Sequence, residues 1–249
     1  MNAWVGIGRS DIGLVRTANQ DAFVSIDHSG LWAVADGMGG HAGGEIAAQT
    51  AIASLRAKAE STGDRLRRGE VTPAAVLIEL VGHAHEAILR RAAIEPQLKG
   101  MGTTIVLLSI PAPESPTAYI AHVGDSRAYR FRSDTLTRLT NDHTLIQKYL
   151  AHGILTHQAA KTHPERHVLT QALGMSFPIK PSVTSVPIQS DDLFLLCSDG
   201  LMKMLEDDDI ETLCAEAGND PVKICNELIA SALDRGGEDN VTVVAIAHP

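Results

Sequence analysis

Short apolar runs of strand length, most of them separated by gaps of turn length, constrain the fold of this 249-residue chain more than any other feature. Gaps this short favour antiparallel pairing, because a parallel pair needs a crossover of about a dozen residues or more. We predict strands at residues 5–8, 22–26, 31–35, 104–110, 117–123, 128–132, 136–140, 183–188, 193–197 and 241–247.

Helical patterns lie between and after these batches of strands. Thr72 can cap a helix whose first residue is Pro73, and apolar residues recur after them at helical spacing. Asp220 and Pro221 repeat this start, and we expect a third helix over residues 44–59. Runs of strands with helices between them predict an α+β fold, with sheet packed on sheet and helices outside.

The chain shows no linker rich in Pro, Ser or Gly and no internal repeat, so we expect a single domain over residues 1–249. Residues 142–181 fit neither the strand nor the helix period, and they contain several histidines. We interpret this segment as an irregular insertion that lies over a site.

Composition and charge exclude several classes of protein. No run approaches the roughly 18 apolar residues of a membrane-spanning helix, and the first residues lack the regions of a signal peptide. The formal charge is -9, from 30 acidic and 21 basic residues, which argues against nucleic acid as a partner. Three widely spaced cysteines indicate reduced thiols. We therefore expect a cytoplasmic protein that binds neither membranes nor nucleic acid.

Four aspartates occupy comparable places, each at an end of an apolar run: Asp36, Asp125, Asp199 and Asp239. Strand ends at one edge of a sheet are where side chains can converge. Converged carboxylates repel each other, at roughly 4 kcal/mol per pair for a separation of about 4 Å and an effective dielectric constant of about 20. They must therefore take up protons or a cation. Ligands that are all oxygen select Mg²⁺ or Mn²⁺.

Two other interpretations of the sequence remain open, a zinc site and a dinucleotide-binding loop. His163 and His167 have the spacing of two zinc ligands on a helix, although Pro164 lies between them. The glycine-rich turn from Gly37 to Ala42 satisfies a loose dinucleotide-binding fingerprint. The charge of Asp36 would repel a pyrophosphate, but a cation on that carboxylate would attract phosphate and let the Gly37 carbonyl approach the ion.

The sequence lacks the motifs of two other classes of enzyme that act on phosphate groups. The sequence has no Gly-x4-Gly-Lys-Ser/Thr loop, which excludes a P-loop nucleotidase. A phosphatase with a cysteine nucleophile needs an arginine six positions after that cysteine. The three cysteines are followed at this distance by Lys203, Asp220 and Ser231. We therefore interpret the cysteines as residues of the core or of helices.

Six motifs that occur in order give the chain a family resemblance: Arg16-Thr17-Ala18-Asn19-Gln20-Asp21, Asp36-Gly37-Met38-Gly39-Gly40, Gly102-Thr103-Thr104, Gly124-Asp125-Ser126-Arg127, Ser198-Asp199-Gly200 and Gly237-Glu238-Asp239-Asn240-Val241-Thr242. The set resembles the metal-dependent Ser/Thr protein phosphatases (PPM, or protein phosphatase 2C, family) in their compact bacterial form. The resemblance covers the chain from about residue 8 to residue 247.

The resemblance implies a four-layer α/β/β/α sandwich, in which two antiparallel sheets hold two Mn²⁺ or Mg²⁺ ions between their edges. Asp36 would bridge both ions and Gly37 would give its carbonyl to one of them. Asp199 and Asp239 would hold the other ion. Two further aspartates would have looser roles: Asp21 through bound water or as a weak ligand, and Asp125, together with Asp199, at a weaker third metal site.

The resemblance also implies catalytic roles. A water between the two cations would lose its proton and attack phosphorus in line, with Asp36 and Arg16 in the catalytic site and Arg16 binding the substrate phosphate. Animal members protonate the leaving group from a histidine where this chain has Met38. His41 is our candidate acid, with a metal-bound water as the alternative. Lys203 replaces an acidic ligand of animal members, which puts the third site in doubt. For Arg127 we favour a structural ion pair.

We therefore expect a protein serine/threonine phosphatase that hydrolyses phosphoserine and phosphothreonine and opposes a cognate bacterial Ser/Thr kinase. We also expect a monomer. The segment 142–181 matches the variable flap of the family, and its histidines are expected at the surface. A catalytically silent module that captures phosphoproteins is the alternative from another class.

Overall fold

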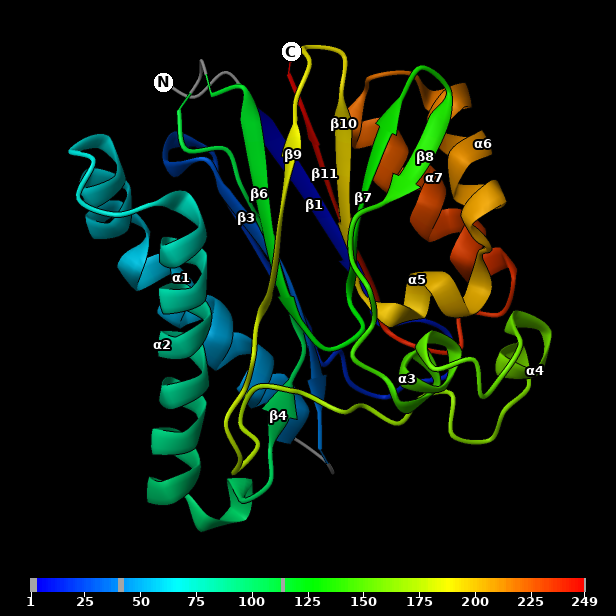
Figure 1. Ribbon diagram of the computed structural model, residues 1–249. Coiled ribbons are helices and arrows are strands. Elements are labelled where there is room, and N and C mark those ends of the chain that lie inside the picture. The colour runs from blue at the N-terminus through cyan, green and yellow to red at the C-terminus, as the bar shows by residue number, and fades with distance from the viewer. Residues whose placement is uncertain (1–3, 40–42, 113–114, 249) are drawn as a thin grey trace.

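The computed structural model describes residues 4–39, 43–112 and 115–248. Two antiparallel sheets face each other, and helices cover the outer side of each sheet (Figure 1). The first strand begins and the last strand ends at the same end of this sandwich, where Val5 lies opposite Ala247. The arrangement confirms the α+β fold class and the four-layer α/β/β/α sandwich expected from the sequence.

The first sheet has five strands and joins the beginning of the chain to its last strand. β1 and β11 pair from Val5 opposite Ala247 to Asp11 opposite Val241. β11 is therefore an inner strand with β10 on its other side. In spatial order the strands are β1 (Val5–Asp11), β11 (Val241–Ala247), β10 (Leu193–Cys197), β7 (Arg127–Arg132) and β8 (Thr135–Arg138).

The second sheet has six strands, five of them in a continuous antiparallel order. β2 and β3 pair so that Asp21 lies opposite Asp36. The short strand β4 (Gly102–Thr103) pairs with the end of β3. The other strands, in spatial order, are β2 (Asp21–Ile26), β3 (Leu31–Met38), β5 (Ile105–Ser109), β6 (Thr117–Val123) and β9 (Ser182–Pro187).

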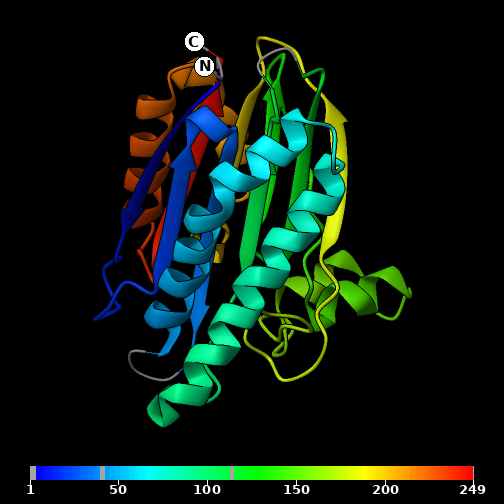
Figure 2. The same cartoon turned by 90° about the vertical axis from the view of Figure 1, so that its left-hand side faces the viewer.

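The long helices α1 (Gly43–Arg67) and α2 (Pro73–Ile94) cover the second sheet (Figure 2). The first sheet is covered by α5 (Asp199–Met204), α6 (Asp207–Ala217) and α7 (Pro221–Asp234). Both predicted capping residues act as expected. The Thr72 side chain accepts a hydrogen bond from the Ala75 amide, and the Asp220 side chain accepts from two amides at the start of α7.

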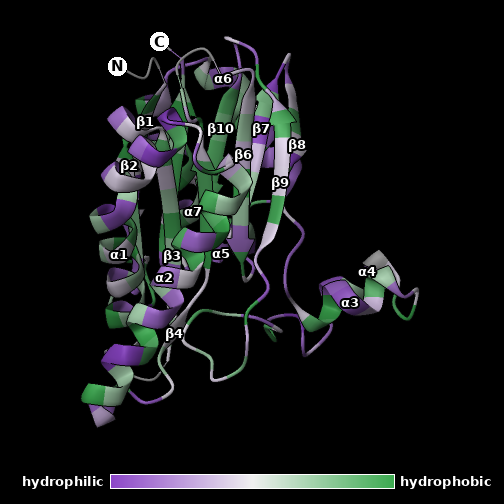
Figure 3. Cartoon of the chain, turned by 60° about the vertical axis from the view of Figure 1, so that its left-hand side comes forward, coloured by the Kyte–Doolittle hydropathy of each residue, from purple (hydrophilic) through white to green (hydrophobic). Residues whose placement is uncertain are grey.

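The core lies in three layers, one between the sheets and one under each set of helices. Trp4, Trp32 and Phe194 fill the layer between the sheets. Asp27 Oδ1 joins the two sheets at this layer, because it accepts hydrogen bonds from the Gly6 amide of β1 and from the Trp32 indole of β3. Figure 3 shows the hydrophobic residues gathered on the strands, while the helices carry hydrophilic residues on their outer faces.

The sequence missed or shortened several elements. α1 runs to Arg67 instead of residue 59, because Thr62 and Gly63 take buried positions in its second half and hide the helical period of apolar residues. The sequence did not predict α5 and α6. Helix α5 has only six residues, and both helices begin with acidic residues instead of an apolar pattern. Two short helices, α3 (Leu145–Ala151) and α4 (His157–Lys161), lie in the predicted insertion and project away from the sheets (Figure 3).

The structure bears out the role expected for the cysteines. Cys197, Cys214 and Cys225 are buried free thiols. Burial raises the pKa of Cys197 and of Cys214 to about 12, so neither sulfur is a ready nucleophile. Within the described part of the chain, none of the helices has the length and apolar character that crossing a bilayer requires.

Candidate metal centre

All five predicted aspartate ligands lie at the end of the sandwich opposite the chain termini (Figure 1). Three follow or end strands that run toward this end, and two stand where strands begin there. Asp36 lies near the end of β3, Asp125 follows β6, Asp199 follows β10 as the first residue of α5, Asp21 begins β2 and Asp239 precedes β11. Antiparallel pairing therefore brings together residues that are more than 200 positions apart in the sequence.

Three of these carboxyls are perturbed by burial and by one another. Burial raises the pKa of Asp21 to about 6 against hydrogen bonds that lower it, and the charges of Asp199 and Asp239 add to the rise. Burial and then the charge of Asp21 raise the pKa of Asp36 well above its usual value. Burial, followed by the charge of Asp199, raises the pKa of Asp125 to about 7. These carboxyls therefore form one electrostatically coupled cluster, as the sequence predicts.

Two cationic side chains, those of Lys203 and Arg16, pair with the other two aspartates, Asp199 and Asp239. Lys203 Nζ lies 2.7 Å from Asp199 Oδ2 and 2.6 Å from Asp239 Oδ2. Arg16 Nε lies 2.8 Å from Asp239 Oδ1. Burial would raise the pKa of Asp239, but its hydrogen bonds with Lys203 and Arg16 lower it. Asp199 and Asp239 are thus held in place by charged side chains of the protein.

The donor set fits a hard divalent cation. Asp21 Oδ2 accepts a hydrogen bond of 2.7 Å from Ser198 Oγ, but the buried Oδ1 atom has no hydrogen-bond partner. A buried oxygen without a partner, beside other carboxylates, is a position that a cation or its water can satisfy. Among the described residues, no three His, Cys, Asp or Glu side chains already surround one point as ligands. Two of the candidate ligands, Asp199 and Asp239, pair instead with Lys203.

Two threonines of the Gly102-Thr103-Thr104 motif fix the backbone at Asp36. Thr103 Oγ1 donates to the Asp36 carbonyl at 2.9 Å, and the Thr104 amide donates to the same oxygen at 2.8 Å. The Asp36 amide donates to Thr104 Oγ1 at 3.2 Å. Gly124 also packs on Thr104, where a Cβ at the glycine would lie 2.6 Å from that side chain. The motif holds the strand end that presents Asp36.

The last motif supports the opposite side of the cluster through Asn240. Asn240 Nδ2 donates to the carbonyls of Ile12 and Ala18, and Asn240 Oδ1 accepts from the Gln20 amide. These bonds hold the loop that carries Arg16. Gly200 packs against the same residue, since a Cβ there would lie 2.0 Å from the Asn240 carbonyl oxygen.

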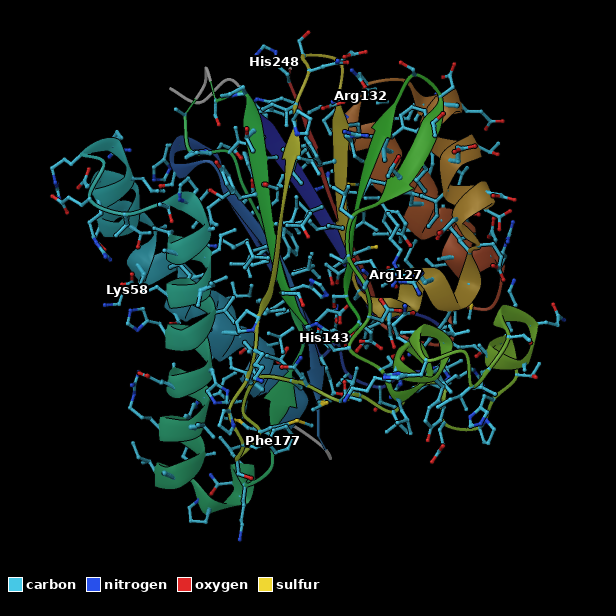
Figure 4. The ribbon with its side chains drawn as sticks, in the orientation of Figure 1. Lys58, Arg127, Arg132, His143, Phe177 and His248 are labelled. Carbon is cyan, nitrogen blue, oxygen red and sulfur yellow. The ribbon has the colours of Figure 1, made fainter. Side chains whose placement is uncertain are left out.

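The sequence did not identify Ser198, Thr104 or Asn240 as supporting residues, although each lies within a motif. They could have been identified from their positions in the sequence, because each lies beside a candidate aspartate or beside a strand end that carries one. Arg127, in contrast, makes the expected structural ion pair, with Nη2 at 2.8 Å from Asp142 Oδ2. Figure 4 shows Arg127 next to α5, at the end of the sandwich that carries the aspartates.

The histidines divide into three cases. His41, the candidate acid, lies outside the described residues, so its role stays a prediction. His143 is only partly exposed, because its ring stacks on His122 with centroids 4.5 Å apart and Nε2 lies 2.9 Å from Ser182 Oγ (Figure 4). His167 lies near enough to the cluster for the charges of Lys203 and Asp199 to affect its pKa, although burial lowers that pKa most. No zinc cluster that includes His163 and His167 is present among the described residues.

The sequence matches the family described as Protein phosphatase 2C over residues 8–227. It is 34% identical over 241 residues to the serine/threonine phosphatase stp of Listeria welshimeri, and the match covers 96% of this chain and 93% of that protein. It is 38% identical over 238 residues to the serine/threonine protein phosphatase PstP of Mycobacterium tuberculosis, covering 95% of this chain and 43% of that protein.

Solved structures of bacterial Ser/Thr phosphatases resemble this chain over nearly its whole length. The crystal structure of the M. tuberculosis phosphatase PstP superposes with a TM-score of 0.88 at 35% identity and covers 98% of each chain. The catalytic domain of PstP in complex with two manganese ions superposes with a TM-score of 0.81 at 34% identity and also covers 98% of each chain.

Proposed function

The chain belongs to the protein phosphatase 2C family, and from that premise we propose that it is a metal-dependent protein serine/threonine phosphatase. The observation that carries the proposal is the convergence of five aspartates beside Arg16 at one end of the sandwich. The relatives named serine/threonine phosphatases and the PstP structure with two manganese ions support it.

We assign the metal ligands as follows. Asp36 would hold both ions, and Gly37 would offer its backbone carbonyl to one of them. Asp199 and Asp239 would hold the second ion. Asp21 has one oxygen fixed by Ser198 and one oxygen without a partner, which suits a bound water or a weak ligand. Asp125 and Asp199 are assigned to a weaker third position.

Two bound Mn²⁺ or Mg²⁺ ions would supply the positive charge that lowers the pKa of an attacking water and neutralises phosphate oxygens. Arg16 provides the substrate contact from the protein. Its side chain is half exposed, and its guanidinium now pairs with Asp239. Asn240 holds the loop backbone, so Arg16 can turn from the carboxylate to a phosphate without loop rearrangement. Its planar fork suits two phosphate oxygens.

The leaving serine or threonine oxygen needs a proton, for which His41 stays our candidate. Replacement of His41 with Gln should slow hydrolysis of a phosphothreonine peptide more than that of p-nitrophenyl phosphate, whose leaving group needs little protonation. Measurement of kcat for both substrates tests this role. Equal slowing of the two reactions would reject it.

We further propose a single catalytic domain over residues 1–249, with residues 142–181 as its flap. Its substrates are phosphoserine and phosphothreonine proteins, and its opposing enzyme is a Ser/Thr kinase of the same cell. We propose that it acts on these phosphoproteins in the cytoplasm, as a monomer.

The test is release of phosphate from a phosphothreonine peptide by protein stripped with a chelator, before and after millimolar Mn²⁺ is added. We expect turnover only with the metal. Asp239→Asn should lose this turnover while the circular dichroism spectrum stays native. A folded wild-type protein that binds Mn²⁺ but releases no phosphate would favour a phosphoprotein-binding module instead.

A further inference from the structure

Lys203 stands apart from the other charged residues of the candidate site because its ammonium pairs with two of the aspartates at once, Asp199 and Asp239. It lies one helical turn after Asp199 on α5, so both side chains lie on the same face of this helix. Its side chain is 24% exposed, and the carboxylate of Asp239 beside it is 13% exposed. Water therefore screens these charges only in part.

The contacts of the Lys203 ammonium are close and numerous. Nζ lies 2.8 Å from Asp199 Oδ1, 2.7 Å from Asp199 Oδ2 and 2.6 Å from Asp239 Oδ2. Three N–H donors of an ammonium can point at two carboxylates in this way. Burial would lower the pKa of Lys203, but attraction by Asp199 and Asp239 raises it overall, so the group stays charged.

These carboxylates are two of the proposed metal ligands. A lone pair that accepts a hydrogen bond from an ammonium group is not free for a cation, and a positive charge nearby repels an incoming ion. Without any ion, however, the same ammonium offsets the repulsion between Asp199 and Asp239. The lysine therefore has opposite effects on the metal-free and the metal-loaded protein.

We propose that Lys203 is a built-in cation that holds Asp199 and Asp239 in place in the metal-free protein and competes with divalent ions for these two carboxylates. The proposal rests on the metal site of the proposed function. Lys203 thus positions the ligands and sets the metal affinity, without contact with the substrate. Metal binding requires the ammonium to withdraw from Asp239.

The competition predicts two shifts in opposite directions for Lys203→Met, which keeps the length of the side chain without its charge. The melting temperature of the metal-free protein should fall, because the two carboxylates then repel each other. The Kd for Mn²⁺ should fall at least tenfold, which corresponds to about 1.4 kcal/mol. Lys203→Arg keeps a positive charge and should bind Mn²⁺ nearly as weakly as the native protein.

The experiment is calorimetric titration of chelator-stripped full-length protein with Mn²⁺, together with melting curves in EDTA. Lys161→Met is the matched control, because Lys161 Nζ also pairs with a carboxylate, that of Glu206 at 3.1 Å, but on exposed side chains. This control should leave the Mn²⁺ affinity unchanged. Lys203→Gln, which keeps a hydrogen-bond donor, replaces the Met variant if the latter does not fold.

The outcomes separate this proposal from the function on which it rests. Unchanged or weaker Mn²⁺ binding by Lys203→Met, with normal binding by the native protein, would overturn the competition alone. A native protein that binds no Mn²⁺ would overturn both the metal site and the role of the lysine. Tighter binding with a lower melting temperature in EDTA would support the proposal even if no phosphatase activity were found.

Discussion

Asp125 should destabilise the metal-free protein above neutral pH, and Asp125→Asn should relieve this cost. The carboxyl follows β6, and burial followed by the charge of Asp199 raises its pKa from 3.8 to about 7. In the unfolded chain the pKa is expected near its ordinary value. The shift of about three units corresponds to at most about 4 kcal/mol, at about 1.36 kcal/mol per unit.

The direction of this change in stability with pH follows from proton linkage. The folded state binds the proton of Asp125 more tightly than the unfolded state does. This contribution to stability is fully present below about pH 4 and is lost as the pH rises through about 7. Asn is uncharged at every pH. The variant should therefore match the native protein in acid and exceed it at pH values above the folded pKa.

Melting curves in EDTA across this pH range provide the assay. For a chain of this size about 1 kcal/mol corresponds to about 2–4 °C, so the Asn variant should melt up to about 8–16 °C higher in mild alkali. Asp191→Asn, at an exposed position, is the control and should show no such pH-dependent gain. An Asp125→Asn protein that melts at or below the native temperature in alkaline EDTA would refute the reasoning.

Four further changes test other parts of the structure. Arg16→Ala should lower kcat/KM for a phosphothreonine peptide by about 10- to 100-fold, because a hydrogen bond to a charged group is worth about 1.5–3 kcal/mol; unchanged kcat/KM would exclude the phosphate contact. Gly200→Ala places a Cβ 2.0 Å from the Asn240 carbonyl and should cost about 1–3 kcal/mol in denaturant unfolding. Gly82→Ala, whose Cβ would meet no atom within 4 Å, should instead stabilise helix α2 by about 0.5–1 kcal/mol. Asp192→Asn removes the charge of a buried carboxylate that pairs with the partly exposed Arg132 and should cost about 1–3 kcal/mol in urea unfolding, with metal-dependent kcat retained.

Local signals in the sequence predicted the parts of the fold that depend on neighbouring residues. The starts of α2 and α7 follow from a capping side chain and a proline, which act within one helical turn. The strand pairs follow from short gaps. The length of α1 did not follow, because Thr62 and Gly63 are buried by packing from elsewhere in the chain.

The same distinction between local sequence signals and distant contacts applies to the candidate site. Asp36 and Asp199 were identifiable because an aspartate at the end of an apolar run leaves a local pattern. The contact of Lys203 with Asp239 was not identifiable, since it depends on how α5 lies against the start of β11. The stacking of His143 on His122 likewise joins the insertion to β6 and has no local sequence signal.

The place of β11 between β1 and β10 has a consequence for biosynthesis. Asp239 lies two residues before this strand, and Asn240, which holds the Arg16 loop, lies between them. A nascent chain that has not yet released these residues from the ribosome lacks one proposed metal ligand and exposes the edges of two strands. Catalytic competence should therefore arise late and abruptly during synthesis, and chains interrupted before residue 239 should aggregate instead of showing partial activity.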